Sequence, residues 1–313
     1  MTSASDDKIG GAEGGFPRAL VGGGARPKAP GSRLSRLLSR SWNGGAVLAY
    51  LPLLVLALYA MGPLVILVSN SLKTAPEIFA QPFMPPSDPQ WANYVQSWQA
   101  GRFATTLWNS LVLVGITVPA VIMISFPAAY ILARQKSALT DGIIIFLLIV
   151  STLPIQLYLI PLFVFLSKTD LLNSRIVLAI VYTAKFSPFA TFLLRAFILK
   201  IPVDLEEAAR IDGASEFRVL TSIMVPIAFP VILTVSLITG LFVWNEFALA
   251  VTLIQDQGLK PVSTSLAAFQ DTYQTNWPLT NAGAVITVIL PLLLFFVVQR
   301  RFIEGLTAGS VKT

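Results

Sequence analysis

Six long apolar runs, separated by shorter polar segments, dominate the chain. Each run approaches the ~20 residues that an α-helix needs to cross a bilayer. Membrane β-strands alternate in polarity over about ten residues, whereas residues 143–150 are apolar on every side. The pattern therefore predicts an all-α, polytopic membrane protein with six transmembrane helices. The runs cover residues 46–68, 107–132, 142–166, 176–199, 227–254 and 282–298.

Composition supports the membrane assignment and removes several kinds of chemistry. Of the 313 residues, 55% are hydrophobic and 12% are charged, against about 25% charged residues in a soluble domain. The chain has no Cys and no His, which excludes disulfides, Cys nucleophiles and His general bases. We see no carboxylate pair at a membrane face. We therefore expect no catalytic residue, cofactor or metal site, and a chain that is not an enzyme.

The first 41 residues differ from the remainder. They combine glycine runs, three prolines and seven basic residues, a composition that cannot bury enough apolar surface to fold. We expect a disordered, basic cytoplasmic tail that touches anionic membrane lipid and needs no nucleic-acid partner. A cleaved signal peptide is not expected, because the first apolar run starts late and is too long. A transmembrane domain over residues 42–305 and a short cytoplasmic tail over 306–313 complete the organisation.

The placement of basic residues predicts the orientation. With the amino terminus in the cytoplasm, sixteen of the 22 Lys and Arg residues lie in inner segments and five in outer loops. Under the positive-inside rule this split favours cytoplasmic location of both termini. Two of the outer segments, residues 69–104 and 255–280, carry Trp, Tyr and amide side chains. Both would face the side from which a solute arrives.

The inner segment between the fourth and fifth runs, residues 201–222, predicts two short helices that meet at a corner. Pro202 suits the first turn of a helix, and Asp204, Glu206 and Glu207 follow near its positive end. Gly213 can end this helix with a positive φ, and Ser215 or Asp212 can cap the next.

One face of the first short helix is small and nearly flat. It comprises Leu205, Ala208, Ala209 and Asp212, at i, i+3, i+4 and i+7 spacing. Such a face can enter a groove on a partner. On physical grounds alone, a surface elbow between two spans is most often a simple connector.

The elbow resembles the EAA motif of ABC importer permeases. That pattern is Glu-Ala-Ala, three residues, Gly, nine residues, Ile, one residue, Leu and Pro. Val225 departs from it, since it stands at the Leu position. The matching residues are Glu207, Ala208, Ala209, Gly213, Ile223 and Pro226.

Further segments extend the resemblance over roughly residues 42–305, in the carbohydrate-uptake branch and nearest the six-span second subunit of the maltose permease. These are residues 109–111, 129–134, 201–202, 212–215 and 244–247. The resemblance implies a type I importer in a bacterial or archaeal cytoplasmic membrane. It pairs two permease subunits, usually different but related chains, with two cytoplasmic ATPases and an extracytoplasmic solute-binding protein. The EAA elbow, or coupling helix, would sit in a cleft on the ATPase.

The sequence agrees with separate ATPase subunits, because it contains no Gly-x-x-x-x-Gly-Lys-Ser/Thr loop for binding ATP. The expected solute is a sugar or a related polyol or oligosaccharide. An ion-coupled secondary transporter is the alternative. That class often shows inverted repeats and a buried ion site, and we find no clear internal repeat.

Polar groups at membrane depth are costly and often functional. For Asn245 and Glu246, lining the solute route and supporting internal packing are equally open. Lys185 is expected to bond within the bundle or to reach water beside Pro188. Trp244 could stack on a sugar ring, although a packing role is the simpler expectation. The candidates for the translocation pathway are Asn245, Glu246, Gln156 and Tyr158.

Overall fold

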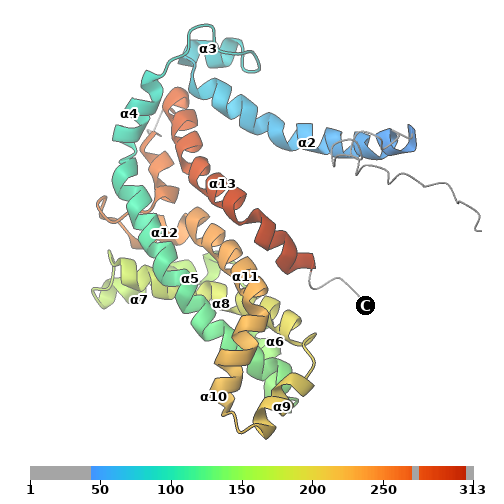
Figure 1. The fold of residues 1–313 in the computed structure, drawn as a ribbon. Helices are drawn as coiled ribbons and strands as arrows, with labels where there is room; N and C mark the ends of the chain where they lie inside the picture. The colour runs from blue at the N-terminus through green and yellow to red at the C-terminus, as the bar shows by residue number, and fades with distance from the viewer. Residues whose placement is uncertain (1–43, 270–274, 308–313) are drawn as a thin grey trace, which may run out of the picture. The chain divides into compact units, whose positions relative to one another are not determined.

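The computed structural model describes residues 44–269 and 275–307, and side chains over 50–269 and 275–296. The predicted tail over residues 1–41 lies outside the described residues, as does most of the predicted tail over 306–313. Two compact units divide the chain after Leu58. The helix α2 (Gly44–Ser71) begins in the first unit and ends in the second, which contains the other described helices (Figure 1).

Five helical segments are long and apolar enough to cross a membrane. The spans within them are Tyr50–Ser71, Phe103–Arg134, Arg175–Ile198, Glu216–Asn245 and Trp277–Phe296. They belong to α2, α5 (Phe103–Arg134), α8 (Arg175–Ile198), the continuous α10–η1–α11 segment, and α13 (Trp277–Thr307).

The third predicted run is not one helix. It forms α6 (Ala138–Thr152) and α7 (Gln156–Lys168), which meet at 90°. Leu153 is extended, with φ −66° and ψ 123°, because the ring of Pro154 disfavours helical geometry in the residue before it. The predicted six spans are reached when this bent pair counts as one.

The fifth predicted run is also interrupted. The helix α11 (Val225–Asn245) stops before Glu246, and α12 (Ala248–Leu253) starts just beyond it. Glu246 is extended, and its carboxylate accepts hydrogen bonds from the backbone N–H groups of Leu249 and Ala250. A side chain that satisfies the first N–H groups of a helix favours a new start at that point.

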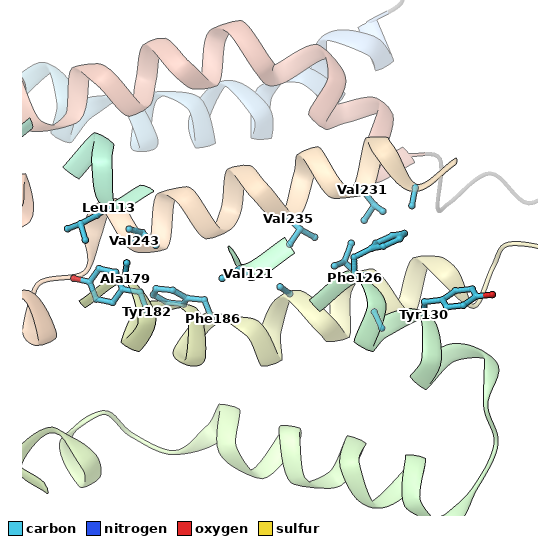
Figure 2. Packing of buried hydrophobic residues seen from close by; sticks show 14 of the residues in the cluster. Leu113, Val121, Phe126, Tyr130, Ala179, Tyr182, Phe186, Val231, Val235 and Val243 are labelled. Atoms are coloured by element: carbon cyan, nitrogen blue, oxygen red, sulfur yellow. The ribbon is translucent and has the colours of Figure 1, made fainter. Parts of the chain in front are cut away.

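The core of the second unit lies where α5, α8 and α11 pack together. Figure 2 shows side chains such as Val121, Tyr182, Phe186 and Val235 meeting between these helices. In a bilayer, such contacts stabilise by close packing rather than by removal of apolar surface from water. By contrast, the apolar side chains of α2 from Tyr50 to Leu58 are exposed, as lipid-facing residues would be.

The two segments predicted to share the outer side contact each other. The first contains α3 (Ala75–Ala80) and α4 (Ala92–Ala100), and the second contains η2 (Val262–Phe269). Ser97 Oγ of the first segment donates to the Leu279 carbonyl of the second at 3.1 Å. The second segment also contacts α5, where Asn109 Nδ2 donates to the Gly258 carbonyl at 2.9 Å. Residues about 150 positions or more apart in sequence thus form one cap over the helix ends.

Candidate functional site

The elbow between α8 and α11 is formed by α9 (Asp204–Ile211), α10 (Glu216–Arg218) and η1 (Val219–Met224). Its three acidic residues lie in the first turn of α9, as predicted. The predicted place of Pro202 in that turn is wrong, because Val203 is the N-cap and the helix starts at Asp204. Pro202 instead precedes the helix, where its fixed φ still directs the chain into it.

The corner has the predicted chemistry. Gly213 has φ +84°, a left-handed conformation that glycine adopts without strain. The Ala214 N–H donates to the Ala209 carbonyl at 2.9 Å, and the Gly213 N–H donates to the Arg210 carbonyl at 3.0 Å. These two bonds form a Schellman motif that closes the end of α9. Ser215 Oγ then accepts from the Arg218 N–H and caps the next helix.

The predicted flat face is only partly free. Leu205, Ala208 and Asp212 are exposed, whereas Ala209 is partly buried and packs against the core. Glu207 is exposed as well. Leu205 and Ala208 therefore form the accessible apolar part of this face, together with the neighbouring Ile211, which is 86% exposed.

Glu206 anchors the elbow to the end of α5. Its side chain is fully buried, unlike that of its neighbour Glu207. One carboxylate oxygen accepts from Arg134 Nε at 2.7 Å, and the other accepts from the Tyr130 hydroxyl at 2.8 Å. Arg134 also donates to the Ile201 carbonyl at 3.0 Å. The residues Tyr130 and Arg134, one turn apart on α5, thereby hold the start of α9.

Arg210 extends this network to the second helix of the elbow. Its guanidinium donates through Nε and Nη2 to the two carboxylate oxygens of Glu216, at 2.6 and 3.1 Å. It also donates to the Tyr130 hydroxyl at 3.0 Å. The hydrogen bonds to Glu216 raise the pKa of Arg210 above its usual range, so this residue stays charged. Both short helices of the elbow are therefore tied to α5.

The two remaining motif residues lie where the elbow enters the membrane helix. Ile223 lies in the π-helical segment η1, and Pro226 lies in the first turn of α11. Proline has no N–H to donate, and its ring would clash with a carbonyl one turn earlier. The wide turn before Pro226 removes this conflict while the helix continues.

A cavity of about 840 Å³ lies between α6, α7, α8 and α11. Its walls are mainly aliphatic and aromatic, and few polar side chains reach it. Binding sites for small molecules commonly have this size and character. The lining residues that carry polar or aromatic groups are Ser151, Tyr158, Lys185, Phe186, Phe189, Phe242, Asn245 and Glu246.

An ion pair joins α8 to the break after α11. Lys185 Nζ lies 3.1 Å from Glu246 Oε1, and the Tyr182 hydroxyl donates to Glu246 Oε2 at 3.1 Å. Leu249 and Ala250 donate their N–H groups to the same carboxylate. A buried charge is tolerated when it is paired and hydrogen-bonded in this way.

The predicted pathway residues divide in the structure. Asn245, Glu246 and Tyr158 line the cavity, whereas Gln156 is exposed and lies outside its lining. Trp244 is buried, and its Nε1 donates to the Thr287 carbonyl at 3.3 Å. This position agrees with the expected packing role of Trp244.

The sequence had not indicated the pairing of Lys185 with Glu246 or the contribution of Tyr182. Tyr182 and Lys185 lie one turn apart on α8, and this spacing is compatible with a shared partner. The sequence does not predict the burial of Glu206 either. Arg210 is a possible partner four residues further on, but Arg134 is 72 positions away in the sequence.

Comparisons with known proteins agree with this geometry. The family described as "Binding-protein-dependent transport system inner membrane component" matches residues 125–307. The sulfoquinovosyl glycerol transport system permease protein SmoH of Agrobacterium fabrum is 31% identical over 273 residues, which cover 87% of this chain and 96% of the relative. The melibiose/raffinose/stachyose import permease protein MelC of Bacillus subtilis is 28% identical over 251 residues, 80% of this chain and 91% of the relative.

A solved structure supports the fold. One chain of a bacterial ABC transporter for import of the acidic polysaccharide alginate aligns with a TM-score of 0.68 at 23% identity. The alignment covers 87% of this chain and 98% of the other. With the family match over more than half of its length, the chain belongs to the binding-protein-dependent transport system inner membrane components, the permease subunits of ABC importers.

Proposed function

We propose that this permease imports a sugar or a related polyol or oligosaccharide across the cytoplasmic membrane of a bacterium or archaeon. Relatives named for melibiose, raffinose and stachyose, and for sulfoquinovosyl glycerol, support a carbohydrate solute. The ion-coupled alternative finds no support among these relatives. Energy comes from ATP hydrolysis in separate partner subunits, and the cavity between α6, α7, α8 and α11 is part of the solute route.

The observation that carries the proposal is the construction of the elbow. Glu206 fixes the helix α9 to α5, while Leu205, Ala208 and Ile211 of the same helix are exposed. A rigid, exposed helix of this kind transmits the movement of a docked ATPase to the membrane helices. Glu207 offers an exposed carboxylate to a basic or amide group of that ATPase.

In the complete transporter, this chain contacts a second permease subunit, the ATPases, a binding protein and membrane lipid. A second permease subunit, related to this chain but different from it, pairs with it in the membrane. Two ATPases dock on the elbows, and an extracytoplasmic binding protein delivers the solute to the outer segments. The basic tail over residues 1–41 lies against anionic lipid in the cytoplasm, where residues 306–313 also end.

The orientation can be tested directly, because the chain has no cysteine of its own. Single cysteines at Ser87, in the outer cap, and at Ser215, in the elbow, are labelled in intact spheroplasts with an impermeant thiol reagent. Ser87→Cys should react and Ser215→Cys should not. Labelling of Ser215→Cys alone would reverse the orientation.

The elbow is tested by adding bulk to its exposed face. Ala208→Trp should insert into the membrane normally, but it should reduce the ATPase that co-purifies and abolish stimulation of hydrolysis by loaded binding protein. Ala138→Trp is the matched control, since Ala138 is also exposed and starts α6 at the same proposed side. Wild-type ATPase content and stimulation in Ala208→Trp would reduce the elbow to a connector.

A further inference from the structure

The Lys185 side chain is the more accessible member of the ion pair beside the cavity. Its side chain is 26% exposed, whereas that of Glu246 is 6% exposed. Within the described part of the chain, the ammonium group has one hydrogen-bond acceptor, Glu246 Oε1 at 3.1 Å. An ammonium group has three N–H donors. The ammonium group also lies 5.2 Å from the centroid of the Phe186 ring. Two N–H donors therefore have no hydrogen-bond acceptor and can bind a group that enters the cavity.

Glu246 has far less capacity left. The Tyr182 hydroxyl, at 3.1 Å, and the N–H groups of Leu249 and Ala250, at 3.1 and 3.2 Å, donate to its Oε2. Its Oε1 accepts from Lys185. The negative charge of Glu246 is therefore stabilised by hydrogen bonds from within the protein. A solute in the cavity would thus meet the cation of the pair before the anion.

The wall beside Lys185 is aromatic. The rings of Phe186 and Phe242 stack with centroids 5.7 Å apart, and Phe189 meets Phe242 edge-on at 5.5 Å. Phe189 and Phe242 are 38% and 43% exposed. Tyr158 adds a hydroxyl for which the described residues provide no hydrogen-bond partner. Aromatic faces with a few placed polar groups suit a ligand that has both an apolar face and oxygen atoms.

We propose that Lys185 is the residue that contacts the solute in this cavity, where its free donors bind an electronegative oxygen group of a saccharide. The rings of Phe189 and Phe242 take the apolar C–H face of the same sugar. Glu246 is a positioning residue, which holds the ammonium group at the wall. This inference rests on the proposed function, because it places the solute route in this cavity.

The charge of the cavity can be measured without knowing the solute. Ser151 lines the cavity, so Ser151→Cys provides a single thiol there, in a transporter whose partner subunits lack reactive cysteines. We would compare its reaction rates with anionic sulfonatoethyl and cationic trimethylammonioethyl methanethiosulfonate. Adding Lys185→Met should lower the anionic-to-cationic rate ratio on the order of tenfold, and Lys185→Arg should preserve it. A cysteine at the exposed Gln99, outside this cavity, should show no such change.

Two saccharides then identify the oxygen group. Raffinose, which is neutral, and digalacturonate, which is acidic, are added at equal concentration before the reagents. Slower modification of Ser151→Cys by either sugar, lost in Lys185→Met, supports the site. Stronger protection by digalacturonate identifies an anionic group, and equal protection identifies hydroxyl groups.

The proposal is overturned if Lys185→Met leaves the anionic-to-cationic rate ratio unchanged, or if neither sugar slows the modification of Ser151→Cys. These measurements need no ATP hydrolysis or transport. They therefore fail independently of the elbow experiment, which tests the proposed function itself.

Discussion

Two buried carboxylates, Glu206 at the base of the elbow and Glu246 beside the cavity, are held in a similar way. Each accepts a hydrogen bond from a tyrosine hydroxyl, from Tyr130 at 2.8 Å and from Tyr182 at 3.1 Å. Each also pairs with a cation one turn further along the helix that carries the tyrosine. Both arrangements tie the start of a short helix to a long membrane helix.

The two carboxylates differ in the cations that pair with them. This difference distinguishes a structural anchor at the elbow from a candidate binding site at the cavity. Arg134 binds Glu206 and the Ile201 carbonyl, and Arg210 adds a second guanidinium beside the same carboxylate. Within the described residues Lys185 donates a hydrogen bond to Glu246 and lies over the ring of Phe186, and two of its N–H donors have no hydrogen-bond acceptor. Arginine fixes geometry through its planar fork, whereas lysine is a point charge on a flexible stem.

A buried charge is therefore not in itself a sign of function. Charged groups in structural networks and in binding sites are both partnered, and both can appear perturbed. The informative quantity is the hydrogen-bonding capacity that remains unused and the space into which it is directed. At the elbow the buried carboxylate lies between two guanidinium groups, and we call this network closed, although Arg134 and Arg210 also border a smaller pocket of about 560 Å³. At the cavity a single ammonium group pairs with the carboxylate beside about 840 Å³ of space, and we call this network open.

The largest expected effect comes from breaking the closed network. Glu206→Ala leaves Arg134 without its carboxylate and should lower the stability of the transporter by about 3–5 kcal/mol. Thermal unfolding of the purified complex measures this change. The matched control, Glu207→Ala, removes an exposed carboxylate and should stay within about 0.5 kcal/mol of wild type. Equal effects of the two changes would contradict the proposed anchoring by Glu206.

A smaller loss is expected at the open network. Glu246→Gln retains the size of the side chain and one oxygen acceptor, and Lys185 can still reach the cavity. We expect a cost of about 1–3 kcal/mol, from the weaker hydrogen bonds to a neutral group. The same unfolding assay applies, with Glu207→Gln as control. A loss that exceeds that of Glu206→Ala would show that the cavity network is the more structural of the two.

The corner of the elbow provides a third, still smaller effect. A side chain at Gly213 has free space but must adopt φ +84°, so Gly213→Ala should cost about 1 kcal/mol. Gly142 also has free space for a Cβ and lacks a positive φ. Gly142→Ala on α6 should therefore be neutral or slightly stabilising. Equal unfolding temperatures of the two variants would remove the argument for strain at the corner.

No effect is expected from the basic tail. Its glycine, proline and charge content predicts that deletion of residues 2–30 leaves uptake unchanged at matched expression. Uptake in cells, normalised to transporter content, provides the measurement. A complete loss of uptake in a normally assembled complex would assign the tail a role in transport.

Features set by local sequence could be predicted with little error. Apolar run length gave the long helices, since a bilayer fixes the length of a span. The positive φ of Gly213 and the cap by Ser215 follow from the conformational preferences of single residues. The bend at Pro154 has a local cause too, although a continuous run of apolar residues masked it.

Features set by tertiary contacts could not be predicted in this way. Glu206 and Glu207 are adjacent and chemically identical, and only the position of α5 decides which one is buried. The break between α11 and α12 at Glu246 contains no glycine or proline from which it could be predicted. Its pairing with Lys185 depends on α8 lying beside the end of α11, which no sequence periodicity indicates.

The most direct test of the account is the source of energy for uptake. The complete transporter is reconstituted in proteoliposomes with its binding protein, and entry of the carbohydrate is followed under two conditions. We predict uptake when ATP is supplied to the ATPase side, and none when a proton or sodium gradient is imposed without ATP. Uptake driven by an ion gradient alone, with no need for ATP, would contradict the assignment of this chain as the permease of an ATP-driven importer.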